Sequence, residues 1–309
     1  MSVSNAYLTY GDVSRKEDVV LNAIETLTAV ENSIFNMLGK TEAIDTVHSF
    51  LVDTLQTPAS GAVQMGADFS YNALTQPARL TNIVQEIAQP IRVARVQQKV
   101  QHYHGQNELQ RQVSKALKDW GNSAEFDLVR STLVSGVSGT VAKMNGIIAA
   151  ISKSTTVTAH TSGTVWSATI LDGLMQNNME NSNGDVATEI FVGGVLKRVT
   201  DNFTQKSNIV VNNPQGQMTI VRTVTTYETS FGTVTFRYHR YVQQTADATS
   251  RVLAIRPEKL KVAFLDRPYI ITDLSKAGAY DPRAVYGSMT LEVRNQDSNW
   301  YTSGFLKTA

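Results

Sequence analysis

The chain has 309 residues, a formal net charge of +1, and 42% hydrophobic but only 18% charged residues. A near-neutral chain argues against a dedicated nucleic-acid binder, and the absence of cysteine excludes disulfides and thiolate chemistry. No apolar run reaches membrane-spanning length and residues 1–18 lack the pattern of a secretory signal, so we expect a cytosolic product.

Length and surface composition favour an interacting protein of two packed sub-domains. Soluble proteins carry about 25% charged residues, and here Gln, Asn, Ser and Thr replace many of them. Such a surface suits large interfaces with neutral hydrogen bonds, although it also fits an ordinary polar protein.

The N-terminal region is predicted to be an arm followed by a helix. Residues 1–13 show no period, whereas a capping-box pattern at 14–17 and an apolar stripe predict a helix that ends at Gly39. The Gly39-Lys40-Thr41 stretch looks like the end of a phosphate-binding loop. Ile34 stands where that loop needs glycine, so we predict no nucleotide site.

A long excursion follows the first helix. Strand-like segments at 47–55 and 87–100 flank residues 56–78, in which the sole charged residue is Asp68. Loops of this length usually mark function or disorder. The apolar content argues against disorder and favours a hairpin arm that lies on a neighbouring subunit, with a reach of about 60 Å at ~3.3 Å per residue.

Residues 105–135 are predicted to form one long amphipathic helix, with Asn107 as its cap and Gly136 as its end. The apolar residues recur at steps of three and four. The side chains that we expect in the core are Leu109, Val113, Leu117 and Trp120.

The remaining chain predicts a mixed α/β sub-domain and then a β-rich segment. A helix is predicted at 166–181, a strand at 188–192 and a second helix from 194 to 202. Strands at 219–229 and 233–242 form the clearest hairpin, and further short strands follow up to 289–294.

No pattern indicates catalysis, a cofactor or a metal. His102 and His104 lack a carboxylate partner, so a surface pair is the better interpretation, and no nucleophile, zinc or calcium motif occurs. A possible basic strip consists of Arg92, Arg95, Lys99, Arg111 and Lys115. We favour a solvated face or inter-subunit ion pairs over nucleic-acid binding for this strip.

The order of these parts resembles the major capsid proteins of tailed bacteriophages, which share the Hong Kong 97-like fold. Local motifs similar to one branch of that family are SFLVDTL at 49–55, GADF at 66–69, the segments 79–100 and 104–117, and LEVRN at 291–295. The resemblance covers nearly the whole chain. The trio of residues needed for covalent cross-linking cannot be placed, so cross-linking is not predicted.

The resemblance implies an α+β fold with an N-terminal arm, an extended β-hairpin loop, a long spine helix, and peripheral and axial sub-domains. The implied divisions are 1–45 for the arm and first helix, 46–100 for the extended loop, 101–150 for the peripheral domain with the spine helix, 151–228 for the axial domain, and 229–309 for a returning β-rich segment shared by both domains.

The implied function is that of a structural, non-enzymatic head protein. Copies would assemble as hexamers and pentamers into an icosahedral shell around double-stranded DNA, in the virion and after assembly in the host cytoplasm. The implied partners are further copies, a portal, scaffolding or decoration proteins, and DNA bound non-specifically, without a membrane. Expected inter-subunit contacts are Met65, Asp68, Phe69, Tyr71, Arg92 and Arg95.

Two other classes stay open at this point. A bacterial encapsulin-type nanocompartment shares the fold type and encloses enzymes in place of a genome. A soluble enzyme with a lid at 56–78 is the less favoured third class.

Overall fold

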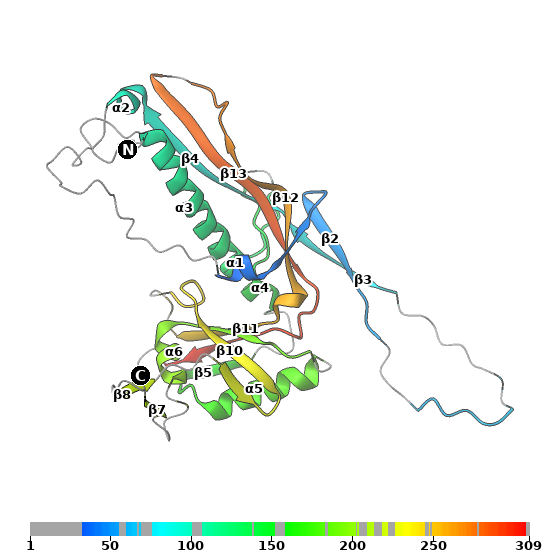
Figure 1. Cartoon of the computed structure of the whole chain (residues 1–309). Helices are drawn as coiled ribbons and strands as arrows, with labels where there is room; N and C mark the ends of the chain where they lie inside the picture. The colour runs from blue at the N-terminus through cyan, green and yellow to red at the C-terminus, as the bar shows by residue number, and fades with distance from the viewer. Residues whose placement is uncertain are drawn as a thin grey trace.

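The structure is a computed structural model. It describes residues 33–55, 60–66, 68, 76–100, 107–137, 139–151, 158–182, 185–201, 203, 209–212, 218–221, 226–244, 247, 249–276 and 278–306. Figure 1 shows two bodies, one above the other, and an arm that leaves the upper body. We call the upper part the sheet body and the lower part the α/β body.

The sheet body consists of one long helix against a four-stranded sheet. The helix is α3 (Glu108–Arg130). The sheet has the order β1-β12-β13-β4, with β1 parallel to β12 and the other pairs antiparallel. Its strands are β1 (Gly39–Glu42), β4 (Gln85–Ala94), β12 (Leu260–Ile271) and β13 (Tyr280–Val293). Short helices α1 (Ser33–Met37), α2 (Arg95–Lys99) and α4 (Ile147–Ile151) flank it.

The α/β body holds a six-stranded sheet of order β5-β14-β11-β6-β10-β9. These strands are β5 (Thr158–Thr164), β6 (Glu189–Val192), β9 (Thr226–Thr229), β10 (Gly232–Tyr238), β11 (Ser250–Ile255) and β14 (Trp300–Phe305). Helices α5 (Ala168–Asn181) and α6 (Gly194–Thr200) belong to this body, as does the small pair β7 (Ile209–Asn212) and β8 (Met218–Val221). The 3-10 turn η3 (Pro257–Lys259) joins β11 to β12.

The arm begins as a ribbon of two antiparallel strands, β2 (Val47–Val52) and β3 (Ala78–Ile83). In Figure 1 this ribbon leaves the sheet body on the side away from α2. The α+β class, the long helix and the two-stranded ribbon of the arm, all expected from the sequence, are present.

The two bodies share hydrophobic packing. The larger core cluster joins α3, α4 and the four-stranded sheet, and it also takes in Phe191 and Leu253 from the six-stranded sheet. A second cluster fills the α/β body between α5, α6 and its sheet, around Trp166, Phe236 and Trp300. After residue 250 the chain passes from the six-stranded sheet (β11) to the four-stranded sheet (β12 and β13) and back again (β14). The two bodies are therefore linked by two chain connections as well as by packing.

Several helix and strand limits differ from the sequence predictions. The long helix ends at Arg130 and not near 135, because Ser131 has an extended backbone (ψ 144°) and its carbonyl accepts from the Gly146 N–H at 2.9 Å. The strand predicted to reach residue 100 ends at Ala94, where its ladder partner β13 begins at Tyr280, and the chain turns into α2.

Other strands were missed or divided. The segment after Gly39 forms β1, and the chain end forms β14, neither of which has a clear alternating pattern. Two of the short strands predicted between 242 and 289 are one strand, because β12 continues through Pro268 with irregular register on either side of Asp266. Most of the helix predicted over 14–38 lies outside the described residues.

Candidate functional site

The root of the arm is fixed to the sheet body by buried polar contacts. Asn82 on β3 donates from Nδ2 to the carbonyls of Leu291 (2.8 Å) and Asn145 (3.1 Å), and its Oδ1 accepts from the Asn145 N–H (2.9 Å). His48 Nε2 on β2 lies 2.7 Å from Glu292 Oε1 on β13. Because both strands of the ribbon are tied to the body, the arm leaves in a defined direction.

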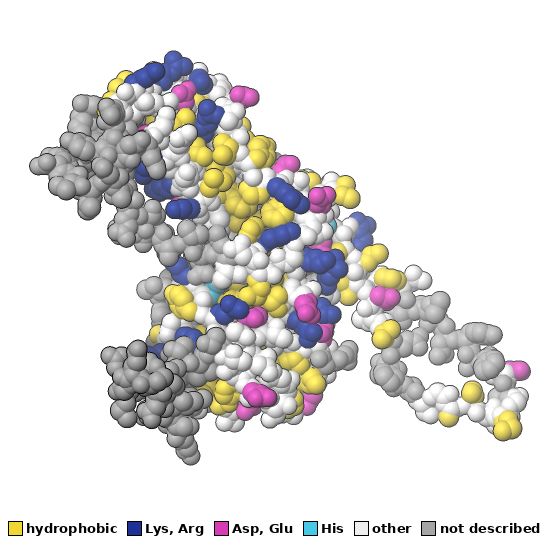
Figure 2. Space-filling model, viewed as in Figure 1, with side chains coloured by type: hydrophobic (Ala, Val, Ile, Leu, Met, Phe, Trp, Pro, Cys, Tyr) yellow, Lys and Arg dark blue, Asp and Glu magenta, His cyan; other side chains and the backbone are white. Residues whose placement is uncertain are grey.

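Beyond its root, the described part of the arm is apolar and uncovered. Leu51 is 69% exposed, and Leu55 and Met65 are fully exposed. Figure 2 shows hydrophobic side chains along the described part of the arm, away from the two bodies. A two-stranded hairpin is marginally stable alone, and exposed apolar surface on this scale marks an interaction site.

Glu125 on α3 joins three parts of the chain. Its carboxylate accepts from the backbone N–H groups of Ile34 (2.8 Å) and Phe35 (2.7 Å) at the start of α1. It also lies 2.8 Å from Nε2 of His239, which follows β10, and both side chains are fully buried. The Tyr241 N–H donates to His239 Nδ1, so the imidazole proton sits on Nε2 and points at Glu125.

Lys40 lies close to this cluster. Its ammonium contacts the Phe35 carbonyl and stands over the Phe35 ring. Burial lowers the pKa of Lys40 to about 8, against the attraction of the Glu125 carboxylate.

A second contact fixes the C-terminal end of α3 to the segment after β10. Arg130 forms a bidentate ion pair with Asp247, at 2.9 and 2.8 Å. Burial alone would raise the pKa of Asp247, but hydrogen bonds from Arg130 and from the Gln244 N–H lower it. Phe126 and Tyr241 pack edge-to-face at 5.6 Å beside this pair.

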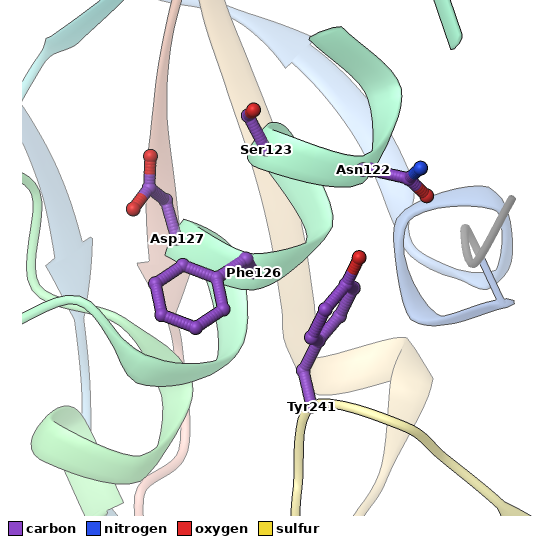
Figure 3. Close-up of a pocket in the computed structure, with 5 residues that line it drawn as sticks. All are labelled: Asn122, Ser123, Phe126, Asp127 and Tyr241. Atoms are coloured by element: carbon purple, nitrogen blue, oxygen red, sulfur yellow. The ribbon is translucent and has the colours of Figure 1, made fainter. Parts of the chain in front are cut away.

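A hollow of about 320 Å³ lies on α3 next to this contact. It is lined by Asn122, Ser123, Phe126, Asp127 and Tyr241, which Figure 3 shows along one side of the helix and at the start of the loop after β10. Burial raises the pKa of Asp127, and a hydrogen bond from Gln85 and the charge of Lys143 oppose this effect. Asp127 is the single carboxylate among these lining residues, and none of them is a histidine or a lysine.

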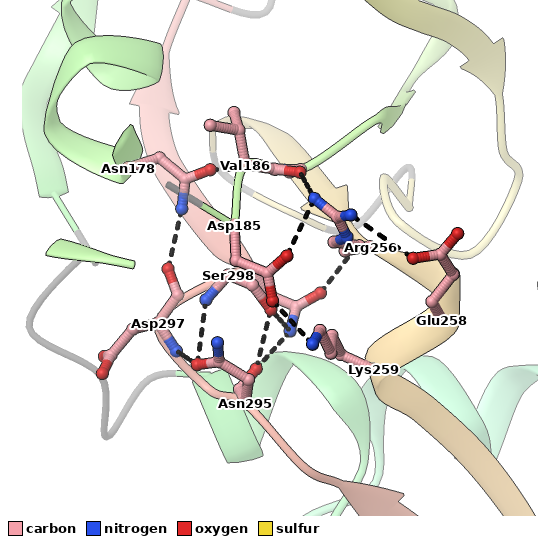
Figure 4. Close-up of polar contacts among 11 residues, drawn as sticks. Asn178, Asp185, Val186, Arg256, Glu258, Lys259, Asn295, Asp297 and Ser298 are labelled. Carbon is pink, nitrogen blue, oxygen red and sulfur yellow. Dashed lines mark hydrogen bonds and ion pairs between the residues drawn. The ribbon is translucent and has the colours of Figure 1, made fainter. Parts of the chain in front are cut away.

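The crossing between the two sheets is held by a polar network, drawn in Figure 4. Arg256 contacts the carboxylate of Asp185 (3.0 Å) and the carbonyl of Val186 (3.2 Å), and Lys259 contacts the same carboxylate (2.8 Å). The Asn178 side chain donates to the Asp297 carbonyl at 2.7 Å. These bonds tie α5 and the start of β6 to the segments that connect β11 with β12 and β13 with β14.

The structure places the predicted contact residues in different regions. Met65 and Asp68 lie exposed on the arm, and Phe69 and Tyr71 fall outside the described residues. Arg92 is exposed on β4, and Arg95 is exposed at the start of α2, about the length of the sheet body away from the arm.

The predicted core stripe of the long helix is partly wrong. Trp120 is buried and donates to the Ile87 carbonyl at 3.1 Å, whereas Leu109 and Val113 are half-buried. Leu117 is 43% exposed and is not a core residue of the subunit. The buried residues of α3 form two lines at steps of four, one through Ala116, Trp120, Ala124 and Leu128 and one through Gly121, Glu125 and Val129. Leu117 lies one turn before the second line begins, so this line is buried only from Gly121 onward.

Sequence reasoning missed the residues that organise the junctions. By its spacing Glu125 is an isolated carboxylate without an identifiable acid or base partner, and no pattern marks Asn82 or His239. No signal in the sequence could have identified the Glu125–His239 pair, whose members are 114 positions apart.

The described residues include neither a membrane-spanning helix nor a metal-binding cluster. No helix among them is long and apolar enough to cross a membrane. Within the same part of the chain, no group of three His, Asp or Glu side chains could hold a metal ion. His102 and His104 lie outside the described residues.

Solved structures share this arrangement. The capsid of a native GTA particle matches with a TM-score of 0.67 at 10% identity, over 94% of this chain and 95% of that one. The capsid of Myoviridae phage XM1 matches at 0.59 and 14% identity, over 95% and 98%. The holo-SrpI encapsulin complex from Synechococcus elongatus PCC 7942 matches at 0.60 and 10% identity, over 92% of each chain. The fold is therefore the Hong Kong 97-like fold of shell proteins.

A match to a protein-family model identifies the family of this chain within that fold. Residues 4–303 match the family model of the SU10 major capsid protein, so the chain belongs to the SU10 major capsid protein family. It is a shell-forming head protein, as the resemblance predicted. No curated protein matches the sequence.

Proposed function

We propose that the arm is the main assembly element of this capsid protein, and that it lies on a neighbouring copy within rings of five and six subunits. The observation that supports this is the contrast between a fixed root and an uncovered apolar ribbon. Asn82 and His48 hold the ribbon in one direction, while Leu51, Leu55 and Met65 contact nothing else in the described part of the chain that would bury them.

We assign the sheet body to the peripheral position and the α/β body to the centre of each ring. We keep the divisions expected from the sequence except for the extended loop, which was expected to span 46–100. The returning strands are divided between the two bodies: β11 and β14 pair in the α/β body, and β12 and β13 in the sheet body. The extended loop is then the β2–β3 ribbon with residues 53–77, because β4 pairs with β13.

The further partners follow from the same role. The shell would enclose double-stranded DNA through weak, non-specific contacts, consistent with a net charge of +1. A portal and scaffolding or decoration proteins would join it, in the virion and during assembly in the host cytoplasm. We propose a structural role without enzymatic activity, in keeping with the SU10 major capsid protein family.

The arm proposal is tested by replacing residues 53–77, which lie between the paired Val52 and Ala78, with a two-residue Asn-Gly turn that keeps the β2–β3 ribbon. The variant should fold, with the thermal unfolding transition of dissociated wild-type subunits, but it should form no closed shells in electron micrographs. Shells of normal size and yield from this variant would contradict the proposal.

A second candidate function is a nanocompartment that encloses enzymes, because an encapsulin complex is among the similar structures. The contents of purified shells separate the two. Nuclease-protected double-stranded DNA supports the virus head, whereas shells that hold protein cargo and no DNA support the nanocompartment.

A further inference from the structure

The hollow on α3 contains a carboxylate that has no ion-pair partner among the described residues. Asp127 Oδ2 accepts from Gln85 Nε2 at 2.6 Å, whereas its Oδ1 accepts no hydrogen bond from this part of the chain. Lys143 is close enough for its charge to act on Asp127 but forms no ion pair with it. Arg130, one turn further along α3, is already paired with both carboxylate oxygens of Asp247. The subunit therefore balances the charge of Asp127 only in part.

The position of Asp127 in the fold makes its negative charge unfavourable. The residue lies in the last turn of α3, where the free carbonyl groups give a helix a partial negative charge. Burial acts in the same direction and raises the pKa of Asp127. A cation bound in the hollow would offset both effects, because cations are stabilised at helix C-termini and beside partly buried carboxylates.

The walls of the hollow suit an organic cation. The rings of Phe126 and Tyr241 lie edge-to-face with centroids 5.6 Å apart, and both line the hollow beside Asp127 (Figure 3). The faces of aromatic rings attract ammonium and guanidinium groups, and Arg240 already stands over the Tyr241 ring at 5.7 Å without lining the hollow. The volume of about 320 Å³ lies within the range of small-molecule sites, about 300–1,000 Å³.

The same walls do not suit a metal ion. Calcium takes about six to eight oxygen ligands, and magnesium requires nearly ideal octahedral geometry. The hollow offers the single carboxylate of Asp127, and the described residues contain no group of three His, Asp or Glu side chains that could hold a metal. A guanidinium or ammonium group, in contrast, is bound well by one carboxylate and one ring face.

We propose that the hollow binds an alkylammonium or guanidinium cation, with the charged group between Asp127 Oδ1 and the Phe126 ring. Two sources can supply this chemistry, a lysine or arginine side chain of another polypeptide and a free polyamine. The inference is independent of the proposed role of the arm, because the hollow lies within one subunit and its binding is measured on dissociated subunits.

The first test is a ligand-observed NMR titration of dissociated subunits with n-butylguanidinium, and with n-butylurea as an uncharged probe of similar shape. The charged probe should bind at least about tenfold more tightly, the equivalent of one charge-assisted hydrogen bond. Asp127→Asn should abolish this preference, and Phe126→Leu should weaken binding of the charged probe about threefold. The matched control is Asp119→Asn, an equal charge change on α3 outside the hollow, which should bind as wild type.

Equal affinity of wild-type protein for the two probes overturns the inference, and this comparison needs no variant. An equal loss of preference in Asp119→Asn also overturns it, since the overall charge of the helix would then be the cause. Lys143→Gln should tighten binding of n-butylguanidinium, because it removes a repelling charge near Asp127. Binding that appears only in this variant would overturn the inference, because Lys143 would then fill the hollow itself.

The source of the cation is identified by carbodiimide coupling in purified shells, followed by mass spectrometry of the peptide that contains Asp127. The reagent activates the carboxylate, and an adjacent amine forms an amide while the reagent leaves as a urea. An amide with spermidine identifies a free polyamine, and an amide with a lysine of another chain identifies a polypeptide. Both products support the proposal, whereas an internal amide with Lys143 overturns it.

Added glycinamide completes this test, because it couples to any activated carboxylate that it can reach. Coupling of Asp127 that is as fast in shells as in dissociated subunits would show an unoccupied carboxylate and overturn the proposal. Protection of Asp127 in shells without an amide product supports an arginine side chain, whose guanidinium group does not couple.

Discussion

Replacing Glu125 by alanine should destabilise the subunit strongly. The change removes the acceptor of three donors, the N–H groups of Ile34 and Phe35 and Nε2 of His239, which lie 2.7 to 2.8 Å from the carboxylate. Each buried donor left without a partner costs about 1–3 kcal/mol. The donors are coupled and a water molecule can serve some of them, so we expect a total of about 3–5 kcal/mol.

The measurement is urea unfolding of dissociated subunits, because assembly would add stability of its own. Tryptophan fluorescence reports the transition, and hydrogen exchange at the Ile34 and Phe35 amides reports the local contact. The matched control is Glu180→Ala on the exposed face of α5, which should change the free energy of unfolding by less than about 0.5 kcal/mol.

Glu125→Gln provides a second variant for the same test, with an intermediate expected loss of stability. The amide keeps one acceptor oxygen but turns its NH₂ group toward one of the donors, so the loss should lie between those of wild type and the alanine variant. A loss below about 1 kcal/mol for Glu125→Ala, with unchanged exchange at both amides, would refute the view that this carboxylate joins α1, α3 and the segment after β10.

Three further predictions concern the same region. Trp120→Ala should cost about 3–5 kcal/mol in urea unfolding, whereas Leu117→Ala on the same helix should cost less than about 1 kcal/mol; equal losses would mean that the buried line is wrongly placed. Because the pKa of Lys40 falls to about 8 in the folded subunit, the unfolded chain binds more protons between pH 8 and about 10.5. The free energy of unfolding should therefore rise with pH across this range, and Lys40→Met should not show this rise. Arg130→Met should cost about 1–3 kcal/mol, because the Asp247 carboxylate loses its bidentate partner and keeps only the Arg251 contact at 3.3 Å and the Gln244 N–H; an unchanged unfolding midpoint would contradict this.

Local pattern predicted the parts of this protein that depend on near neighbours in sequence. The long helix, its Asn107 cap and the hairpin turn before Gly232 were all predicted, because helices and tight turns are determined by side chains within about four positions. The uncharged stretch at 56–78 predicted an arm, since few charges and several apolar residues suit neither disorder nor a water-facing loop.

The sequence by itself therefore determined the order of the elements, the α+β class and the family. Tertiary structure decided which face of α3 is buried, because Leu117 and Trp120 are both apolar and the choice depends on where β4 and β13 lie. It also decided the partners of Glu125 and Asn82, which come from positions 91 to 209 residues away. Polar side chains have many possible partners at such distances, and only the packed chain selects one of them.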